Sequence, residues 1–224
     1  MEEKNNLTAE RSLEIITEQI ERSRQIVAKD TGELLFNSSL CIIGISLLVF
    51  ICLLLTGNTA FYLLFILVPA VIYGANLYVK RDRPQVPVNY VGYLVDKTWH
   101  TFGTFAILYF VLFSFHPFWT GQGSSEVLLH LNIISFRTIL LMMGMTIAIT
   151  GHILKKQWMV VCGICGGVVG FEWESFNMTQ NLLSWLGADT SENGTAYGMI
   201  PSIIIAIFSF VGLTLPGWLL KKQS

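Results

Sequence analysis

Charged residues are scarce in this chain: only 13% of its 224 residues are Asp, Glu, Lys or Arg, against roughly 25% in a typical soluble domain. Alternating ten-residue strand patterns, which mark outer-membrane barrels, are also lacking. The apolar residues, 53% of the chain, instead form long continuous runs. Runs of about 18 or more apolar residues predict transmembrane helices. The expected fold is therefore an all-α polytopic membrane helix bundle.

The sequence also lacks the signatures of common catalytic and nucleotide-binding sites: HExxH, GxSxG, a Gly-rich phosphate loop and a Rossmann fingerprint. Its four cysteines, Cys41, Cys52, Cys162 and Cys165, all lie in apolar runs. This placement excludes the disulfide framework of a small secreted domain. We expect no cofactor, no bound metal and no nucleic-acid partner, and these absences weigh against an enzyme.

The apolar runs predict six transmembrane helices behind a polar N-terminal segment. Residues 1–34 form that segment, within which 8–30 are expected to be an amphipathic helix, and 35–224 form the transmembrane domain. The expected spans are about 35–56, 60–79, 99–119, 128–153, 157–174 and 199–219. A short interfacial helix is expected in the segment between the last two spans.

Basic residues are sorted to one side of these spans. All 14 Lys and Arg residues except Arg137 fall before the first span, after the second, between the fourth and fifth, or after the sixth. The loops at 120–126 and 175–198 contain none. Because short cytoplasmic loops carry the excess of Lys and Arg, both termini are expected in the cytoplasm.

Arg137 is the one basic residue inside an expected span. A charge at that depth costs about 2.5–3.5 kcal/mol on insertion scales, so a partner in the bundle interior is expected. Arg137 lies 18 residues before Lys155, and Glu172 and Glu174 lie 17 and 19 residues after it. At 1.5 Å per residue all three are level. We expect an ion pair, with Glu172 favoured over Glu174, that serves as a structural clip or lines a polar cavity.

Histidines and a carboxylate flank the expected outer turn between the third and fourth spans. His116 and His130 lie at mirrored positions around that turn, and Glu126 lies between them. These residues form a possible outer-side polar cluster, but no zinc-binding spacing accompanies them. His116, followed by Pro117, is expected to end the third span.

Glycines are concentrated in the fifth expected span. Gly163 with Gly167 and Gly166 with Gly170 form overlapping GxxxG pairs, which predict close packing against another helix. The CGICGG run also contains a CxxC pattern. Working redox cysteines lie at exposed helix N-termini rather than inside a span, so helix packing is the favoured interpretation.

The amphipathic segment 8–30 carries Leu13, Ile16, Ile20 and Val27 on one face. An apolar stripe of this kind packs on the bundle, lies on the membrane or docks on a partner. The sequence leaves these alternatives open.

The chain resembles a set of small six-span bacterial inner-membrane proteins. The resemblance covers most of the chain and rests on SLEIITEQIERSR (12–24), YLVDKTWHTFG (93–103) and the hairpin GMTIAITGHILKKQWMVVCGICGG (144–167). It implies the bacterial cytoplasmic membrane and no particular activity. Glycosylation sequons at Asn177 and Asn193, with the terminal KKQS, keep the endoplasmic reticulum membrane as an alternative location.

Three classes of function fit these features. A non-enzymatic partner or regulatory membrane protein would bind a second copy or another membrane protein through 8–30 or the Gly-rich face of the fifth span. The alternative is a small-solute or ion channel or transporter with a cavity around Arg137. The second alternative is a membrane-embedded enzyme that uses the outer-side His and Glu residues. The absence of catalytic signatures favours the first class.

Overall fold

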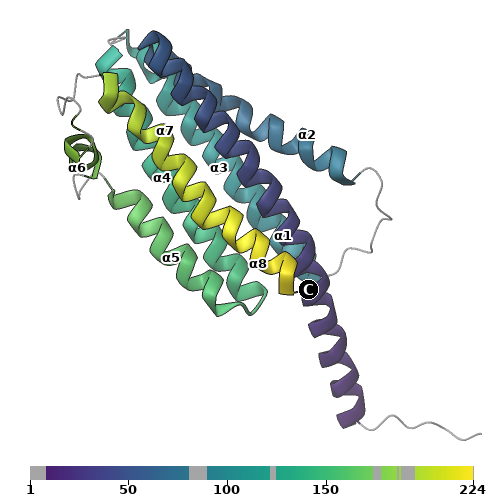
Figure 1. Ribbon diagram of the computed structural model, residues 1–224. Helices are drawn as coiled ribbons and strands as arrows, with labels where there is room; N and C mark the ends of the chain where they lie inside the picture. The colour runs from purple at the N-terminus through teal and green to yellow at the C-terminus, as the bar shows by residue number, and fades with distance from the viewer. Residues whose placement is uncertain are drawn as a thin grey trace, which may run out of the picture.

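The computed structural model describes residues 9–80, 90–121, 125–173, 178–185, 187 and 195–223. Within these ranges the regular structure is helical and contains no strand, which confirms the all-α prediction. The elements are α1 (Ala9–Thr56), the 3-10 helix η1 (Thr59–Leu67), α2 (Val68–Lys80), α3 (Tyr90–Thr120), α4 (Ser125–Ile153), α5 (Gln157–Glu172), α6 (Met178–Trp185), α7 (Thr195–Ser209), the π-helix η2 (Phe210–Thr214) and α8 (Leu215–Gln223). Figure 1 shows the long helices side by side and the short α6 set apart at one end.

Among the described residues, four helices are long and apolar enough to cross a membrane, which indicates a membrane protein. They are Arg11–Thr56, Tyr90–His116, Leu131–Ile153 and Met199–Lys222. Two shorter apolar helices, Thr59–Gly74 and Gln157–Glu172, occupy the positions of the second and fifth expected spans. Length and composition therefore identify four candidate spans, where the sequence predicts six.

The first expected span and the amphipathic segment before it form one continuous helix. α1 has 48 residues and is about 72 Å long at 1.5 Å per residue, more than twice the roughly 30 Å of a bilayer core. Its N-terminal part projects beyond the ends of the other helices (Figure 1). The helix passes through Gly32 without a break, because the backbone there packs against Gly217 of α8.

The second expected span consists of two helices rather than one helix bent in its middle. Asn58 caps η1, and its side-chain oxygen accepts a hydrogen bond from the Ala60 N–H at 2.9 Å. The α-helix α2 then begins at Val68. Pro69 therefore lies in a first helical turn, where its missing N–H leaves no helix bond unmade.

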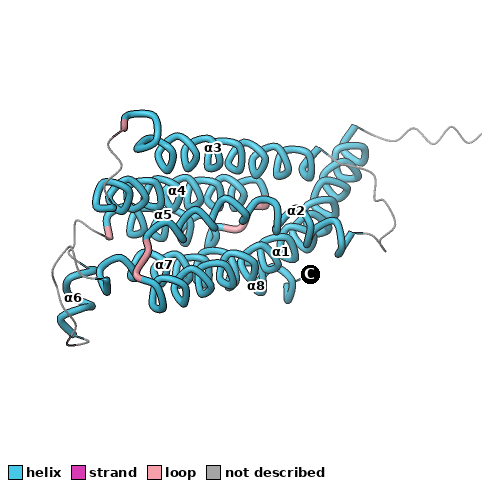
Figure 2. The backbone as a smooth tube through the Cα atoms, turned by 90° about the horizontal axis from the view of Figure 1, so that it is seen from above, coloured by secondary structure: helices cyan, strands magenta, loops and turns pink. Residues whose placement is uncertain are grey.

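Helix α4 lies at the centre of the packing. It contacts α3, α5, α7 and η1, while α1 runs along α7, η2 and α8. Figure 2 shows α3, the α4–α5 hairpin and the α7–α8 segment as successive layers. The ring of Phe136 in α4 packs on Tyr62 and Phe65 of η1 and Phe110 of α3, with centroid distances of 5.4, 4.9 and 5.8 Å. Such pairs add roughly 0.5–1.5 kcal/mol each beyond their burial, so this cluster fixes η1 against α3 and α4.

Buried hydroxyl groups join helices that are distant in sequence. Thr214 of η2 donates a hydrogen bond to the Ser39 hydroxyl of α1 at 2.8 Å. Ser114 of α3 donates to Oδ1 of Asn132 in α4 at 3.0 Å. Cross-helix bonds of this kind contribute about 0.6 kcal/mol on average in membrane proteins, and they fix which faces meet.

The last apolar helix changes its hydrogen-bond register near its middle. In η2 the Leu215 N–H bonds to the carbonyl of Phe210, five residues earlier. Pro216 follows directly and has no N–H to continue the α-helical ladder. The wider π turn places the Thr214 hydroxyl against Ser39, so the irregularity serves the contact between η2 and α1.

Candidate functional site

Arg137 bonds to the backbone of the neighbouring helix. It lies half-buried on α4, and its Nε donates to the carbonyl oxygen of Phe171 at 2.6 Å. Its guanidinium also covers the Phe171 ring, 5.1 Å from the ring centroid. Phe171 belongs to the last turn of α5, where carbonyls lack partners within the helix and carry the negative end of the helix dipole. The bond therefore gives the Arg137 charge a polar partner and satisfies one of the carbonyls at the C-terminal end of α5.

The carboxylates predicted to pair with Arg137 follow Phe171 in the chain. Glu172 is half-buried and ends α5, so it lies at the predicted height, one residue from the observed partner. Glu174 lies outside the described residues. The bond that the structure gives Arg137 is to a backbone carbonyl, and the ion pair stays a prediction.

The outer-side polar cluster is described only in part. His116 is exposed on α3 and does not end that helix, which continues through Pro117 to Thr120. The side chains of Glu126 and His130 lie outside the described set. Within the described part of the chain, no group of three or more His, Cys, Asp or Glu could hold a metal ion. The structure thus adds no support to a metal or catalytic centre on this side.

Glycines bring the backbones of α4 and α5 into contact. A Cβ atom on Gly163 would lie 2.6 Å from both the Ala148 nitrogen and the Gly144 oxygen, and one on Gly167 would lie 3.0 Å from the Gly144 Cα. Gly170 packs against the Leu140 side chain. The GxxxG pattern of α5 does not say which helix it packs against. The helix is α4, in which Gly144 and Ala148 form a second pair of small residues four apart.

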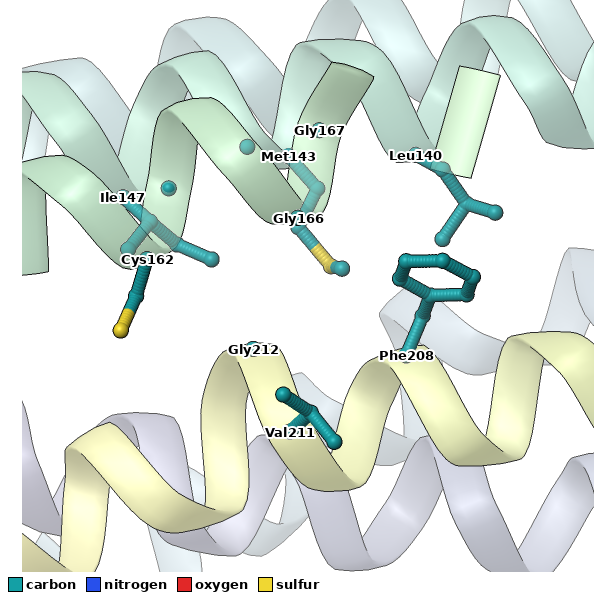
Figure 3. A pocket seen from close by; sticks show the side chains of 11 residues that line it. Leu140, Met143, Ile147, Cys162, Gly166, Gly167, Phe208, Val211 and Gly212 are labelled. Atoms are coloured by element: carbon teal, nitrogen blue, oxygen red, sulfur yellow. The ribbon is translucent and has the colours of Figure 1, made fainter. Parts of the chain in front are cut away.

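Gly166 has a different environment: a Cβ added there would meet no atom within 4 Å. It lines a narrow crevice between the α4–α5 hairpin and η2, shown in Figure 3. The crevice is lined by Leu140, Met143, Gly144, Ile147, Cys162, Gly163, Gly166, Gly167, Phe208, Val211 and Gly212. Its volume of about 20 Å³ accommodates about one water molecule, and its lining is apolar. The crevice is therefore a packing gap rather than a substrate site.

The projecting part of α1 exposes most of the apolar stripe that the sequence predicts. Leu13, Ile16 and Ile20 are 64%, 52% and 43% exposed, whereas Val27 on the same face is 8% exposed. The predicted apolar stripe is thus covered by the bundle at its C-terminal end only. On a helix that continues into a span, an uncovered stripe marks an interaction surface.

A search of protein-family models, curated proteins and solved structures finds no match for this chain. The resemblance to six-span bacterial proteins therefore stays a prediction.

Proposed function

We propose that this protein is a six-span integral membrane protein, with both termini in the cytoplasm, that binds a partner protein through the projecting part of α1. The observation that carries the proposal is that α1 continues unbroken from its span and leaves Leu13, Ile16 and Ile20 exposed. Fully burying one such side chain contributes about 1.5–3 kcal/mol. Because Leu13, Ile16 and Ile20 are 64%, 52% and 43% exposed, each would contribute about half of that value, and together they favour contact of this face with an apolar partner surface.

The lengths of the two shorter apolar segments are compatible with six spans. η1 and α2 together rise about 37 Å, enough for a bilayer core of roughly 30 Å. α5 has 16 residues and rises about 24 Å. A bilayer accommodates a short helix by local thinning, and α5 is held in a hairpin with the longer α4. The one-sided distribution of Lys and Arg supports the cytoplasmic placement of both ends.

The bacterial cytoplasmic membrane is the location that we propose. The support is the sequence resemblance together with the four apolar helices. A transport function centred on Arg137 has less support, because its guanidinium bonds to a backbone carbonyl and covers an aromatic ring. Arg137 lines neither the crevice between the α4–α5 hairpin and η2 nor the space beside Trp218 and Phe36.

Photo-crosslinking in intact cells tests the partner surface. A photoreactive phenylalanine analogue replaces Ile16 on the apolar face or, as the matched control, Glu18 on the opposite face of the same exposed turn. We expect a discrete adduct of fixed mass from position 16 and none from position 18. Equal labelling at both positions, or none at position 16, would contradict a specific partner on this face.

A further inference from the structure

A notch lined by lysine and aromatic side chains lies beside the crossing of α1 and α8. The two helices cross at Gly32 and Gly217, where a Cβ on Gly217 would lie 2.7 Å from both the Gly32 oxygen and the Phe36 nitrogen. Because neither glycine has a side chain, the backbones touch, and larger side chains surround the space beside the crossing. The notch has a volume of about 270 Å³ and is lined by Phe36, Trp218, Lys221 and Lys222.

The lining combines two kinds of surface. Lys221 and Lys222 are exposed, and the Lys222 Nζ lies 5.3 Å from the centroid of the Trp218 ring. Trp218 is itself 49% exposed, and Phe36 is half-buried. The lining thus combines two lysine side chains with two aromatic rings.

The notch lies at the end of two candidate spans. Met199–Lys222 ends within it, and Arg11–Thr56 passes through it at Phe36. One turn deeper, Leu40 of α1 and Leu215 of α8 are 51% and 41% exposed. Trp at the membrane interface with Lys just outside it is the usual order at a lipid surface. The cations are therefore at headgroup depth, and exposed apolar side chains continue toward the bilayer interior.

We propose that this notch binds the headgroup of an anionic phospholipid. The two lysines contact its phosphate, and Trp218 with Phe36 contacts the glycerol backbone and the first acyl carbons. Basic pockets between transmembrane helices are suited to such headgroups. On the topology proposed above, the notch faces the cytoplasmic leaflet. Binding of the headgroup itself does not depend on the side of the membrane.

Native mass spectrometry of the purified full-length protein tests this site. The protein is equilibrated with mixed micelles of dioleoyl phosphatidylglycerol and dioleoyl phosphatidylcholine, and bound lipids are counted. We expect selective retention of phosphatidylglycerol. The Lys221→Gln/Lys222→Gln variant should lose about fivefold in affinity per lysine, which corresponds to the usual contribution of one lysine at an anionic surface.

Two variants and one competitor make the result decisive. Lys155→Gln/Lys156→Gln removes a lysine pair from the α4–α5 turn, outside the notch, and should leave selectivity unchanged. Lys221→Arg/Lys222→Arg keeps both positive charges and should retain binding. A loss that is confined to the Gln variant is then due to the removed charge and not to misfolding. Equal retention of the two lipids, an equal loss in the turn variant, or complete displacement by 10-fold excess inorganic phosphate over lipid would overturn the lipid site. None of these outcomes bears on the photo-crosslinking of α1, so the two proposals fail separately.

Discussion

Arg137 on α4 and Phe171 on α5 are joined twice: the Arg137 Nε donates to the Phe171 carbonyl at 2.6 Å, and the guanidinium covers the Phe171 ring. The two residues lie 34 positions apart, on opposite arms of the hairpin that turns near Lys155. This double contact sets the register of α4 against α5 and places the positive charge at the negative end of the α5 dipole.

Arg137→Lys is expected to destabilise the protein although the charge is kept. An ammonium group lacks the planar geometry that lets Arg donate to the carbonyl and stack on the ring at once. Hydrogen bonds to charged groups contribute about 1.5–3 kcal/mol, and we expect a loss at the low end of that range because Arg137 is only half-buried. Thermal unfolding in detergent measures it, with Arg22→Lys on exposed α1 as the control. Equal melting temperatures for the variant and the native protein would contradict the double contact.

A double-mutant cycle distinguishes the carbonyl from the predicted carboxylate as the partner of Arg137. Stabilities are compared for Arg137→Gln, Glu172→Gln and the combined variant. We expect a coupling free energy near zero, because the observed bond is to the Phe171 backbone and persists without the carboxylate. A coupling above about 1 kcal/mol would instead establish the ion pair that the sequence predicts.

Gly144→Ala is expected to separate α4 from α5. The added Cβ would lie 2.5 Å from the Gly163 carbonyl oxygen, and overpacking of this kind costs typically 1–3 kcal/mol. Gly166→Ala is the matched control: the added Cβ meets no atom within 4 Å in the crevice, so the change should be neutral or slightly stabilising because Ala favours helix. The measurement is the midpoint of denaturation for both variants. A neutral Gly144→Ala would show that the helices do not touch there.

Thr214→Val removes the hydroxyl that η2 donates to Ser39. The shape of the side chain is nearly kept, so the expected cost is about 0.6 kcal/mol, the average for hydrogen bonds between membrane helices. Thr104→Val serves as control, since its hydroxyl bonds only within α3, to the His100 carbonyl on an exposed face. A loss no larger than that of the control would argue against a role for this bond in holding η2 to α1.

The long apolar runs predicted the helical fold, and helix rise predicted the level of Arg137 to within one residue. The hydrogen bond from Arg137 to the Phe171 carbonyl could not be predicted, because a backbone carbonyl has no residue signature. The position of the helix end does carry information. The last turn of α5, whose carbonyls have no partner within the helix, lies level with the guanidinium of Arg137. A GxxxG pattern does not identify Gly144, whereas Gly144 with Ala148 is an equivalent small-residue pair.

The sequence predicts an amphipathic helix over 8–30 and a span that begins near residue 35, whereas the structure has one helix across both. Composition changes sharply near residue 34, and Gly32, a residue type that often ends a helix, lies close to this change. The structure keeps the helix continuous because that glycine provides close approach to α8 rather than a turn. A single sequence does not distinguish these two uses of glycine, since the contact involves a residue 185 positions away.

The unbroken course of α1 joins the Leu13–Ile20 surface rigidly to the bundle. The crossing at Gly32 and Gly217 lies near the middle of the 48-residue helix and holds the two backbones in direct contact. The part of α1 that follows packs along α7, η2 and α8, and no turn separates it from the exposed part. A load applied to the Leu13–Ile20 surface is therefore carried into the helices of the bundle, since no hinge lies between them to absorb it.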